Sequence, residues 1–166
     1  LAFVDSQDSA TIALQKGTPT TPGGNSPFRD RSIEENSILF SEMKNGKHPQ
    51  GSLVLRAKID MSSPNLLLRD PVIYRIIHAT HPRTGDRWCI YPTYDFAHGQ
   101  SDAIEGISHS LCTLEFADHR PLYNWFINTL PVPAKPNQYE FAKLQITHTI
   151  LSKRRLTRLV AENYVK

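Results

Sequence analysis

The alternation of hydrophobic and polar residues predicts three strands in the first half of the chain. Residues 52–60 alternate apolar side chains with a second face that carries Arg56, which is typical of a half-buried strand. Residues 72–80 and 87–91 predict two further strands, joined by a hairpin loop in which Gly85 supplies positive φ. These segments predict an antiparallel sheet.

A helix is expected just before this sheet. Ser32 and Glu35 form a capping box that starts it, and Gly46 is placed to end it. Residues 17–27 contain three prolines and three glycines, so they predict an exposed loop. Residues 1–16 predict only a short helix with a weak pattern.

From about residue 94 the pattern is typical of an α/β unit. A brief helical turn is predicted over residues 101–106. The order strand, helix, strand, helix predicts a βαβ unit with a parallel sheet. The four predicted elements are a strand at 109–116, a helix at 121–130, a strand at 139–150 and a helix at 155–164.

Composition and charge exclude some classes of protein. The net charge of +3 is mildly basic and does not identify a nucleic-acid partner by itself. No apolar run approaches the roughly 20 residues that cross a bilayer. The chain has neither an initiator Met nor a secretory signal, so we expect a segment of a longer cytoplasmic protein. Cys89 and Cys112 form no CxxC motif and are expected to be buried free thiols.

Two segments combine residue types that bind small ligands. Residues 151–155 place Ser152 and Lys153 after a predicted strand, where an α/β sheet binds phosphate. A solvated basic turn has the same composition. Tyr94 and His98 follow another predicted strand and enter a polar loop, where they can meet a polar ligand or simply belong to the core.

Two further segments leave similar alternatives open. Residues 109–118 end a strand with small polar side chains and Asp118, which can face a ligand or cap the next helix. The loop over residues 17–27, with Arg29 and Arg31 behind it, can rest on a phosphate backbone or be a plain surface loop. The histidines show no HxH or HExxH spacing, so no metal site is predicted.

Read together, seven segments resemble the glutaminyl-tRNA synthetases, a family of class I aminoacyl-tRNA synthetases. The resemblance extends from about residue 17 to the end of the chain. The matching segments are SPFRDRS at 26–32, LRAKIDM at 55–61, RDPVIYRI at 69–76, WCIYPTYDF at 88–96, SHSLCTLEF at 108–116, QYEF at 138–141 and LSKRR at 151–155.

The resemblance implies an α/β fold in three parts. Residues 1–92 would form an α+β antiparallel-sheet insertion that binds the acceptor stem of a tRNA. Residues 93–154 would form the second half of a class I Rossmann-like catalytic fold, and residues 155–166 the start of a helical stem-contact region. No HIGH-type motif occurs in the sequence, so we expect this segment alone to be inactive.

The same resemblance implies sites for ATP, which carries Mg²⁺, and for glutamine. Residues 151–153 match the second class I signature, with Lys153 and Ser152 in the catalytic role of stabilising the phosphates. Tyr94 matches the tyrosine that reads the glutamine amide, and His98, Cys112 and Gln138 surround that pocket. The positions matched to ATP contacts are Thr113, Lys143, Leu144, Leu151, Ser152 and Lys153.

For the tRNA, the resemblance assigns contacts to Asp118, in the minor groove of the acceptor stem, and to the loop that helps to open the end of that stem. The tRNA-contact positions are Asp118, Thr18, Pro19, Arg29 and Arg31. Two residues depart from the family pattern. Pro19 stands where a bulkier apolar wedge is expected, and Leu151 replaces a Met.

The expected function is therefore a part of a monomeric glutamine–tRNA ligase, which activates glutamine with ATP and transfers it to the 3′ end of tRNA(Gln). Two alternatives remain at this point. One is a glutamyl-tRNA synthetase of the same subclass, and the other is a non-catalytic RNA-binding module derived from a synthetase.

Overall fold

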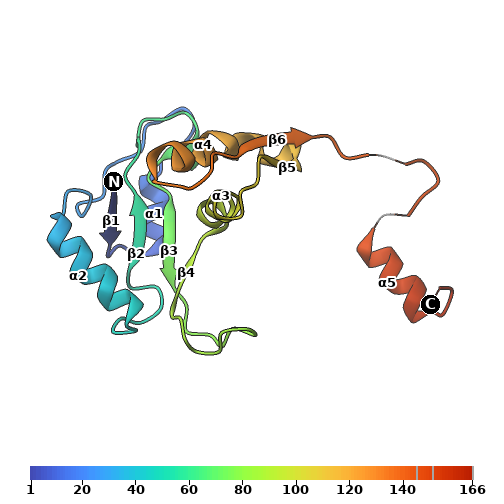
Figure 1. Ribbon diagram of the computed structural model, residues 1–166, viewed down its shortest axis with the longest axis horizontal. Helices are drawn as coiled ribbons and strands as arrows, with labels where there is room; N and C mark the ends of the chain where they lie inside the picture. Colours follow the sequence, from blue (N-terminus) through green and yellow to red (C-terminus); the bar gives the residue numbers. More distant parts are fainter. Residues whose placement is uncertain (145, 151, 166) are drawn as a thin grey trace.

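The first half of the chain forms a four-stranded antiparallel sheet in the order β1-β2-β3-β4 (Figure 1). This computed structural model describes all residues except 145, 151 and 166. The strands are β1 (Ala2–Asp5), β2 (Val54–Ala57), β3 (Val72–Ile76) and β4 (Ile90–Pro92). The predicted antiparallel sheet is confirmed. The prediction of helix over residues 1–16 is wrong in part, because β1 precedes α1 (Ser9–Gln15) and pairs with the distant β2.

Helix α2 (Ile33–Lys44) starts and ends where the sequence predicts. The Ser32 hydroxyl accepts a hydrogen bond from the Glu35 backbone N–H at 3.1 Å. The Glu35 carboxylate pairs with Arg31 rather than reaching back to the cap. Gly46 has φ of 71°, the left-handed conformation that commonly ends a helix.

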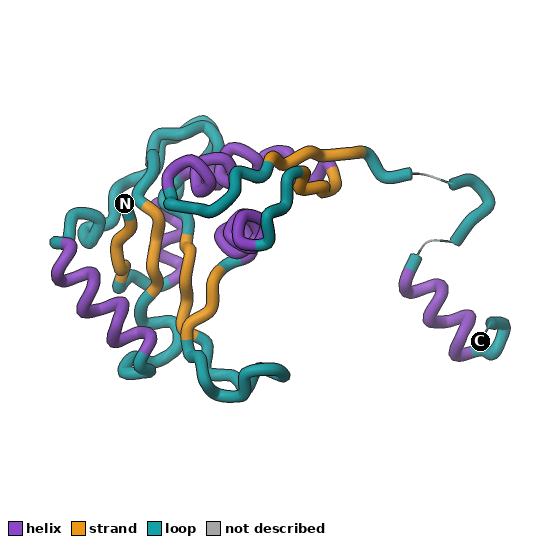
Figure 2. Tube along the Cα trace, viewed as in Figure 1, coloured by secondary structure: helices purple, strands orange, loops and turns teal. Residues whose placement is uncertain are grey.

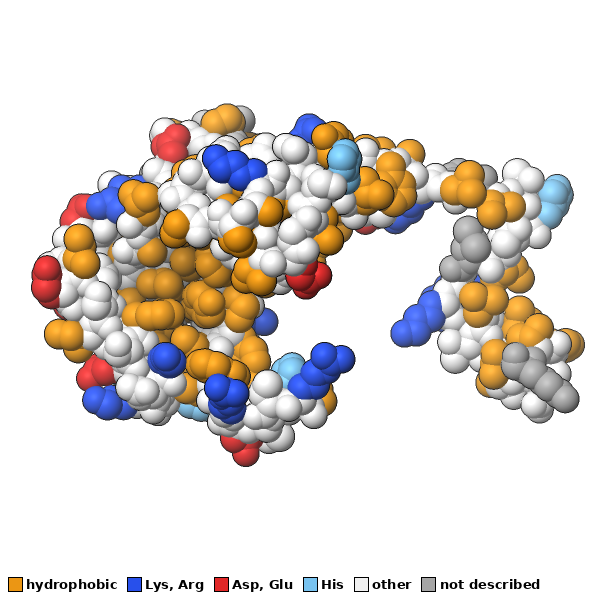
Figure 3. All heavy atoms as spheres, viewed as in Figure 1, with side chains coloured by type: hydrophobic (Ala, Val, Ile, Leu, Met, Phe, Trp, Pro, Cys, Tyr) orange, Lys and Arg blue, Asp and Glu red, His pale blue; other side chains and the backbone are white. Residues whose placement is uncertain are grey.

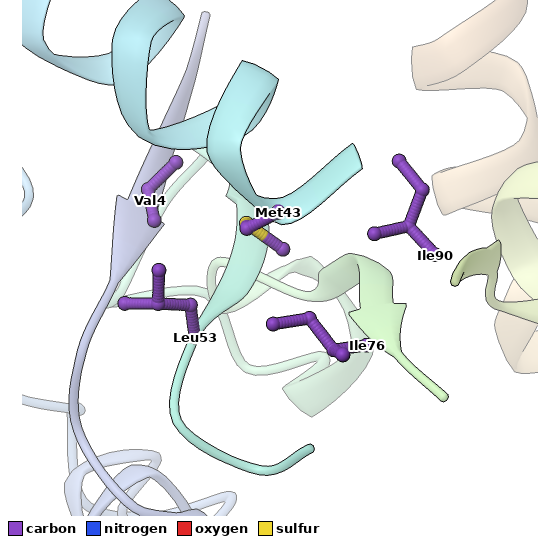
Figure 4. Packing of buried hydrophobic residues seen from close by; sticks show 5 residues of the cluster. All are labelled: Val4, Met43, Leu53, Ile76 and Ile90. Atoms are coloured by element: carbon purple, nitrogen blue, oxygen red, sulfur yellow. The ribbon is translucent and has the colours of Figure 1, made fainter. Parts of the chain in front are cut away.

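Two apolar clusters cover the sheet. Met43 of α2 packs against Val4, Leu53, Ile76 and Ile90 (Figure 4). Burial of a side chain of this size stabilises the fold by about 1.5–3 kcal/mol. A second cluster joins Ala57 and Ile73 to Leu122 and Phe126 of α4 (Arg120–Thr129). Leu55 of β2 and Tyr74 of β3 pack against both clusters, so the two clusters adjoin across the sheet.

The second half of the chain forms a small parallel sheet. Strand β5 (His109–Thr113) pairs in parallel with β6 (Asn137–Phe141), and η2 (Leu114–His119) and α4 connect them. The predicted βαβ unit and α4 are confirmed. The mixed α/β fold thus combines one antiparallel and one small parallel sheet.

Two elements of this half have other bounds than predicted. The turn predicted over residues 101–106 is the end of a full helix, α3 (Tyr94–Ile104), so Tyr94 lies in a helix and not in a loop. Strand β6 stops at Phe141 instead of residue 150. Its partner β5 ends at Thr113, which is paired with Phe141, so β5 offers no residue beyond that point for β6 to continue the ladder.

The last helix, α5 (Lys153–Ala161), agrees with the predicted helix and lies well apart from both sheets (Figures 1 and 2). Among the described residues no helix has the length and apolarity required to cross a lipid bilayer. The two cysteines are free but only half buried, which corrects the expectation of buried thiols.

A buried ionic cluster lies inside the first sheet, where the sequence predicted a solvent-facing arginine. The pairing register shifts between Leu55 and Arg56, and Arg56 is fully buried. Its Nη1 lies 2.7 Å from the Asp5 carboxylate, and its Nε donates to the Asp70 carbonyl oxygen at 2.8 Å. The guanidinium also lies 5.4 Å from the centre of the Phe3 ring.

The Asp70 carboxylate continues this cluster towards the loop. It accepts hydrogen bonds from Arg29 Nε at 2.6 Å and from the Ile59 backbone N–H at 2.7 Å. Asp70 itself has φ of 40°, which a non-glycine residue adopts only when its surroundings compensate the strain. The cluster therefore fixes β1, β2 and the segment before β3 relative to one another.

Replacing Asp5 with Asn should lower the free energy of unfolding of the full-length protein by about 3–5 kcal/mol, because the Arg56 charge would stay buried without its partner. Urea denaturation measures this change. The matched control is Asp30→Asn, which breaks the exposed pair with Lys58 and should change stability little. Equal effects of both substitutions would contradict the role assigned to the buried pair.

Candidate functional site

An aromatic site forms where β4 enters α3. Thr93 anchors this junction, because its hydroxyl donates to the Val72 carbonyl oxygen at 2.9 Å. Tyr94, the first residue of α3, is 56% exposed and stacks on His98, with 5.3 Å between ring centres. Phe116 of η2 lies 5.5 Å from Tyr94 on another side. The phenol of Tyr94 is thus held by two rings and stays accessible to a ligand.

Polar contacts behind Tyr94 fix the imidazole of His98. Its Nε2 lies 2.9 Å from the Ser110 hydroxyl and 3.3 Å from an Asp102 carboxylate oxygen. The Tyr123 hydroxyl donates to the same Asp102 oxygen at 2.9 Å. Residues of α3, β5 and α4 therefore share one network, and His98 is oriented by partners that are themselves held.

The next wall of the site comes from β5 and β6. Cys112 and Glu140 are direct partners in the parallel register. Gln138 is almost fully buried and donates to the Phe116 carbonyl oxygen at 3.2 Å and to the Glu140 carboxylate at 2.9 Å. Glu140 also pairs with Arg120 at 3.4 Å. The structure thus brings Tyr94, His98, Cys112 and Gln138 to one region.

The electrostatic environment keeps the phenol of Tyr94 and the thiol of Cys112 protonated. Burial, with the nearby Cys112 and the acidic Asp95 and Asp102, raises the pKa of Tyr94 above its ordinary value. Burial and the Glu140 carboxylate raise the pKa of Cys112. Both groups therefore remain neutral at physiological pH.

A cavity of about 270 Å³ opens at the carboxyl ends of β5 and β6, where open α/β sheets bind their ligands. Thr113 and Lys143 line it and both contact the Glu115 carboxylate. The bonds from Lys143 and then Thr113 lower the pKa of Glu115. Leu144, another position matched to ATP contacts, directly follows Lys143 and is 79% exposed.

The residues of the class I signature lie away from this region. Ser152 is the N-cap of α5 and Lys153 its first residue, and α5 stands apart from both sheets (Figure 3). Leu151 lies outside the described residues. The structure therefore does not bring Lys153 next to Tyr94 or Thr113.

A third region is a groove of about 470 Å³ between the loop at residues 17–27 and η2. Pro19 lies on one side and Asp118 on the other. One alternative from the sequence was that Asp118 caps α4, and it is wrong because His119 is the N-cap. The Asp118 carbonyl oxygen accepts a hydrogen bond from Asn65 Nδ2 at 2.8 Å. Thr18 forms a tight turn with Thr21 and places Pro19 at the tip. The full lining is Pro19, Pro64, Asn65, Leu66, Leu67, Glu115, Asp118 and His119.

Arg29 and Arg31 make contacts within the chain. Arg29 pairs with Asp70, and its side chain is 15% exposed. Arg31 donates to the Val4 carbonyl oxygen at 2.7 Å and lies 4.1 Å from the centre of the Phe28 ring. These contacts give both arginines a structural role, while their contact with RNA stays a prediction.

Sequence reasoning missed several residues of the site. Asp102 and Tyr123 complete the network of His98, and Asp95 pairs with His119 at 2.6 Å. The spacing of His98 and Asp102, four residues apart, would have indicated their contact if the helix had been recognised.

Two further observations concern metal ligands and a second hollow. In the ranges 1–144, 146–150 and 152–165, no three His, Cys, Asp or Glu side chains gather where they could hold a metal ion. A hollow of about 390 Å³ beside α2 and β4 is lined mainly by apolar side chains, among them Phe40, Tyr74 and Ile90 (Figure 3). Lys44 supplies the charged side chain of its lining.

Comparison with known protein families identifies the family of this chain. Residues 1–166 match the family model described as tRNA synthetases class I (E and Q), catalytic domain. The chain belongs to this family. The resemblance to class I synthetases in the sequence is thereby confirmed.

Three relatives of this class I family carry the name glutamine–tRNA ligase. The protein of Bradyrhizobium diazoefficiens is 67% identical over 165 residues, and that of Nitrobacter winogradskyi 64% over 164 residues. The protein of Pseudomonas aeruginosa is 62% identical over 164 residues. Each alignment covers 99% of this chain but only 29–30% of the relative, so the chain spans under a third of their length.

The Tyr123 hydroxyl generates a prediction about alkaline stability. Burial, and then the hydrogen bond to Asp102, raises the pKa of Tyr123 above its ordinary value of 10.0. Above pH 10 the unfolded chain loses this proton first, so the free energy of unfolding falls as the pH rises. Tyr123→Phe should make this fall shallower above about pH 10 and should cost about 1.5–3 kcal/mol at neutral pH.

Denaturant midpoints measured across this pH range test the prediction. Tyr164→Phe, at a 73% exposed position, is the control and should leave the pH profile as it is. Identical alkaline slopes for the unmodified protein and Tyr123→Phe would contradict the shifted titration of Tyr123.

Proposed function

We propose that this chain is the part of a glutamine–tRNA ligase that selects glutamine, binds one side of ATP and receives the end of the tRNA. The observation that carries the proposal is the joined network of Tyr94, His98 and Asp102 beside the carboxyl ends of two parallel strands. Its support is the family match together with relatives that bear that name. The proposed partners are glutamine, ATP and the acceptor stem of tRNA(Gln).

The proposed division follows the two sheets. Residues 1–92 hold the antiparallel sheet and would be the acceptor-binding insertion. Residues 93–154 hold the parallel pair and would be the second half of the Rossmann-like catalytic fold, with residues 155–166 starting a helical stem-contact region. The parallel pair is consistent with half of an open α/β sheet, whose remaining strands would come from outside this segment.

Selection of glutamine would depend on Tyr94 and on the charges around it. The Tyr94 hydroxyl, kept protonated, can exchange hydrogen bonds with the side-chain amide, while His98 fixes the ring by stacking. A glutamate carboxylate would lie near Asp95 and Asp102, whose negative charges raise the pKa of Tyr94 and oppose a further anion. Cys112 and the buried Gln138 would limit the shape of the pocket.

Activation of glutamine is an in-line displacement at the α-phosphorus of ATP, in which the amino-acid carboxylate attacks and pyrophosphate leaves. Such a step requires alignment and charge neutralisation more than a protein nucleophile. Thr113 and Lys143 would bind the nucleotide at the strand ends. Lys153, with Ser152, would neutralise the phosphates, which requires α5 to approach these strand ends in the complete protein. The described residues assemble no metal-binding group of their own, so no step is assigned to the Mg²⁺ that accompanies ATP.

The groove between Pro19 and Asp118 would receive the acceptor end of the tRNA. Glu115 lines both this groove and the cavity at the strand ends, so the two spaces adjoin. A 3′ end that passes through the groove would therefore arrive beside the activated amino acid. Asp118, exposed at the rim, could accept hydrogen bonds from base edges in the shallow minor groove of A-form RNA.

Tyr94→Phe in the full-length protein should lower kcat/KM for glutamine by about 10- to 100-fold and leave KM for ATP unchanged, because only the amide contact is lost. Aminoacylation of tRNA(Gln) measures both constants. Tyr139→Phe, an exposed tyrosine of β6, is the matched control. Equal losses for glutamine and ATP would mean that Tyr94 is only structural. If the unmodified protein prefers glutamate, the proposed substrate is wrong.

Lys153→Met should slow amino-acid activation in the full-length protein by about 100-fold, because one cation that stabilises the transition state is removed. The melting temperature should not change, since Lys153 is exposed. Single-turnover formation of the aminoacyl adenylate gives the rate. Lys135→Met, at another exposed lysine, should retain full activity. A normal rate in Lys153→Met would remove this lysine from the mechanism.

A further inference from the structure

The loop that carries Pro19 is held at its base by one buried arginine. Arg69 is 1% exposed and lies directly before Asp70 of the ionic cluster. Its Nη1 donates to the carbonyl oxygens of Lys16 and Thr21, the latter at 2.8 Å. The Lys16 carbonyl precedes the tip of the loop, and the Thr21 carbonyl follows it.

The same guanidinium also binds the segment that leads into residues 64–67 of the groove lining. Arg69 Nε donates to the Ser63 carbonyl oxygen at 2.7 Å. Ser63 directly precedes Pro64 and Asn65, which line the groove together with Pro19. One planar side chain therefore connects both ends of the turn that carries Pro19 to the segment that supplies residues 64–67 of the groove. The rigid fork of the guanidinium fixes the directions of its donors, which the flexible ammonium of a lysine cannot do.

The glycines at the base of the loop leave little freedom for another arrangement. Gly17 has φ of 69°, and a Cβ there would lie 2.6 Å from the Thr21 carbonyl oxygen and 3.1 Å from Arg69 Nη1. At Gly23 a Cβ would lie 2.8 Å from the Gln15 carbonyl oxygen. The Gly23 backbone N–H donates to the Met61 carbonyl oxygen at 2.8 Å. The base of the loop is thus closely packed, while its tip at residues 18–20 is exposed.

We propose that Arg69 is a positioning residue for the tRNA acceptor end: it sets the position of the Pro19 tip relative to the wall at residues 64–67, and so the width of the groove. The inference rests on the function proposed above. Arg69 would not touch the RNA, because it is buried beneath the loop. Its effect would pass through the loop tip alone, and it would therefore leave the glutamine and ATP sites unaffected.

The buried arginine of the sheet provides a matched control. Arg56 is as buried as Arg69, but its contacts are with Asp5 and the Asp70 carbonyl oxygen and not with the loop. Both arginines should contribute to stability. Only Arg69 should affect how the enzyme uses the tRNA.

The experiment compares Arg69→Gln and Arg56→Gln in the full-length protein by steady-state aminoacylation. Arg69→Gln should lower kcat/KM for tRNA(Gln) by about 10- to 100-fold, the scale of loss that follows a misplacement of roughly 1 Å. KM for glutamine and for ATP should stay unchanged at saturating tRNA. Arg56→Gln should lower the melting temperature without a loss confined to tRNA. Arg69→Lys should be intermediate.

A second substrate separates positioning from general damage. If the loop tip acts on the end of the acceptor stem, a tRNA(Gln) transcript whose first base pair is mismatched should regain most of the activity lost in Arg69→Gln. Gly17→Ala disturbs the loop base from the other side and should give the same pattern, even if Arg69→Gln proves too unstable to assay.

Three outcomes would overturn the inference. They are an unchanged kcat/KM for tRNA(Gln) in both loop-base variants, equal losses for all three substrates, and an Arg56→Gln profile that matches that of Arg69→Gln. An unmodified protein that does not charge tRNA(Gln) would instead overturn the proposed function, and the inference with it. Normal charging by the unmodified protein together with any of the three outcomes would overturn the inference alone.

Discussion

The buried cluster of Arg56, Asp5 and Asp70 is the constraint that holds the first sheet together, and α2 and α4 pack on that sheet. Charges removed from water must be paired and hydrogen-bonded, so this cluster permits few arrangements of the segments that supply it. Asp5 comes from β1, Arg56 from β2 and Asp70 from the segment before β3. Arg56 binds the Asp70 carbonyl oxygen, and the Asp70 carboxylate pairs with Arg29 and so holds the chain behind the loop. The sheet is therefore fixed by directional contacts as well as by its apolar clusters.

This constraint explains which parts of the fold were predictable from the sequence. Helix α2 and helix α4 have local signals, the Ser32 cap and the apolar spacing of Leu122 and Phe126, and the structure contains both. Strand β1 has four residues and forms only because it pairs with β2, which lies about fifty positions away in the sequence. The inward turn of Arg56 depends on a register shift that alternation alone does not reveal.

The residues of the candidate site also divide into those that the sequence predicted and those that it did not. Tyr94, His98, Cys112 and Gln138 were found through a resemblance, and the fold brings them to one region. Asp102 and Tyr123 were missed because the helix that carries Asp102 was not expected to begin at Tyr94. Gly99 in the middle of α3 weakens the helical pattern, yet it is needed there, since a Cβ would lie 3.3 Å from the Tyr123 ring. A close contact between two helices thus hides the helix in the sequence.

The arrangement also separates selection from catalysis. The groups proposed to recognise glutamine lie on short, packed elements whose side chains hold one another through His98, Asp102 and Tyr123. The lysine proposed to act on the phosphates begins a helix that stands apart from these elements. A site that rejects a carboxylate by surrounding charge needs a fixed geometry, because Coulomb energies change with distance. A cation that neutralises charge only during the reaction can approach late, and a late approach allows substrates to enter before the site is complete.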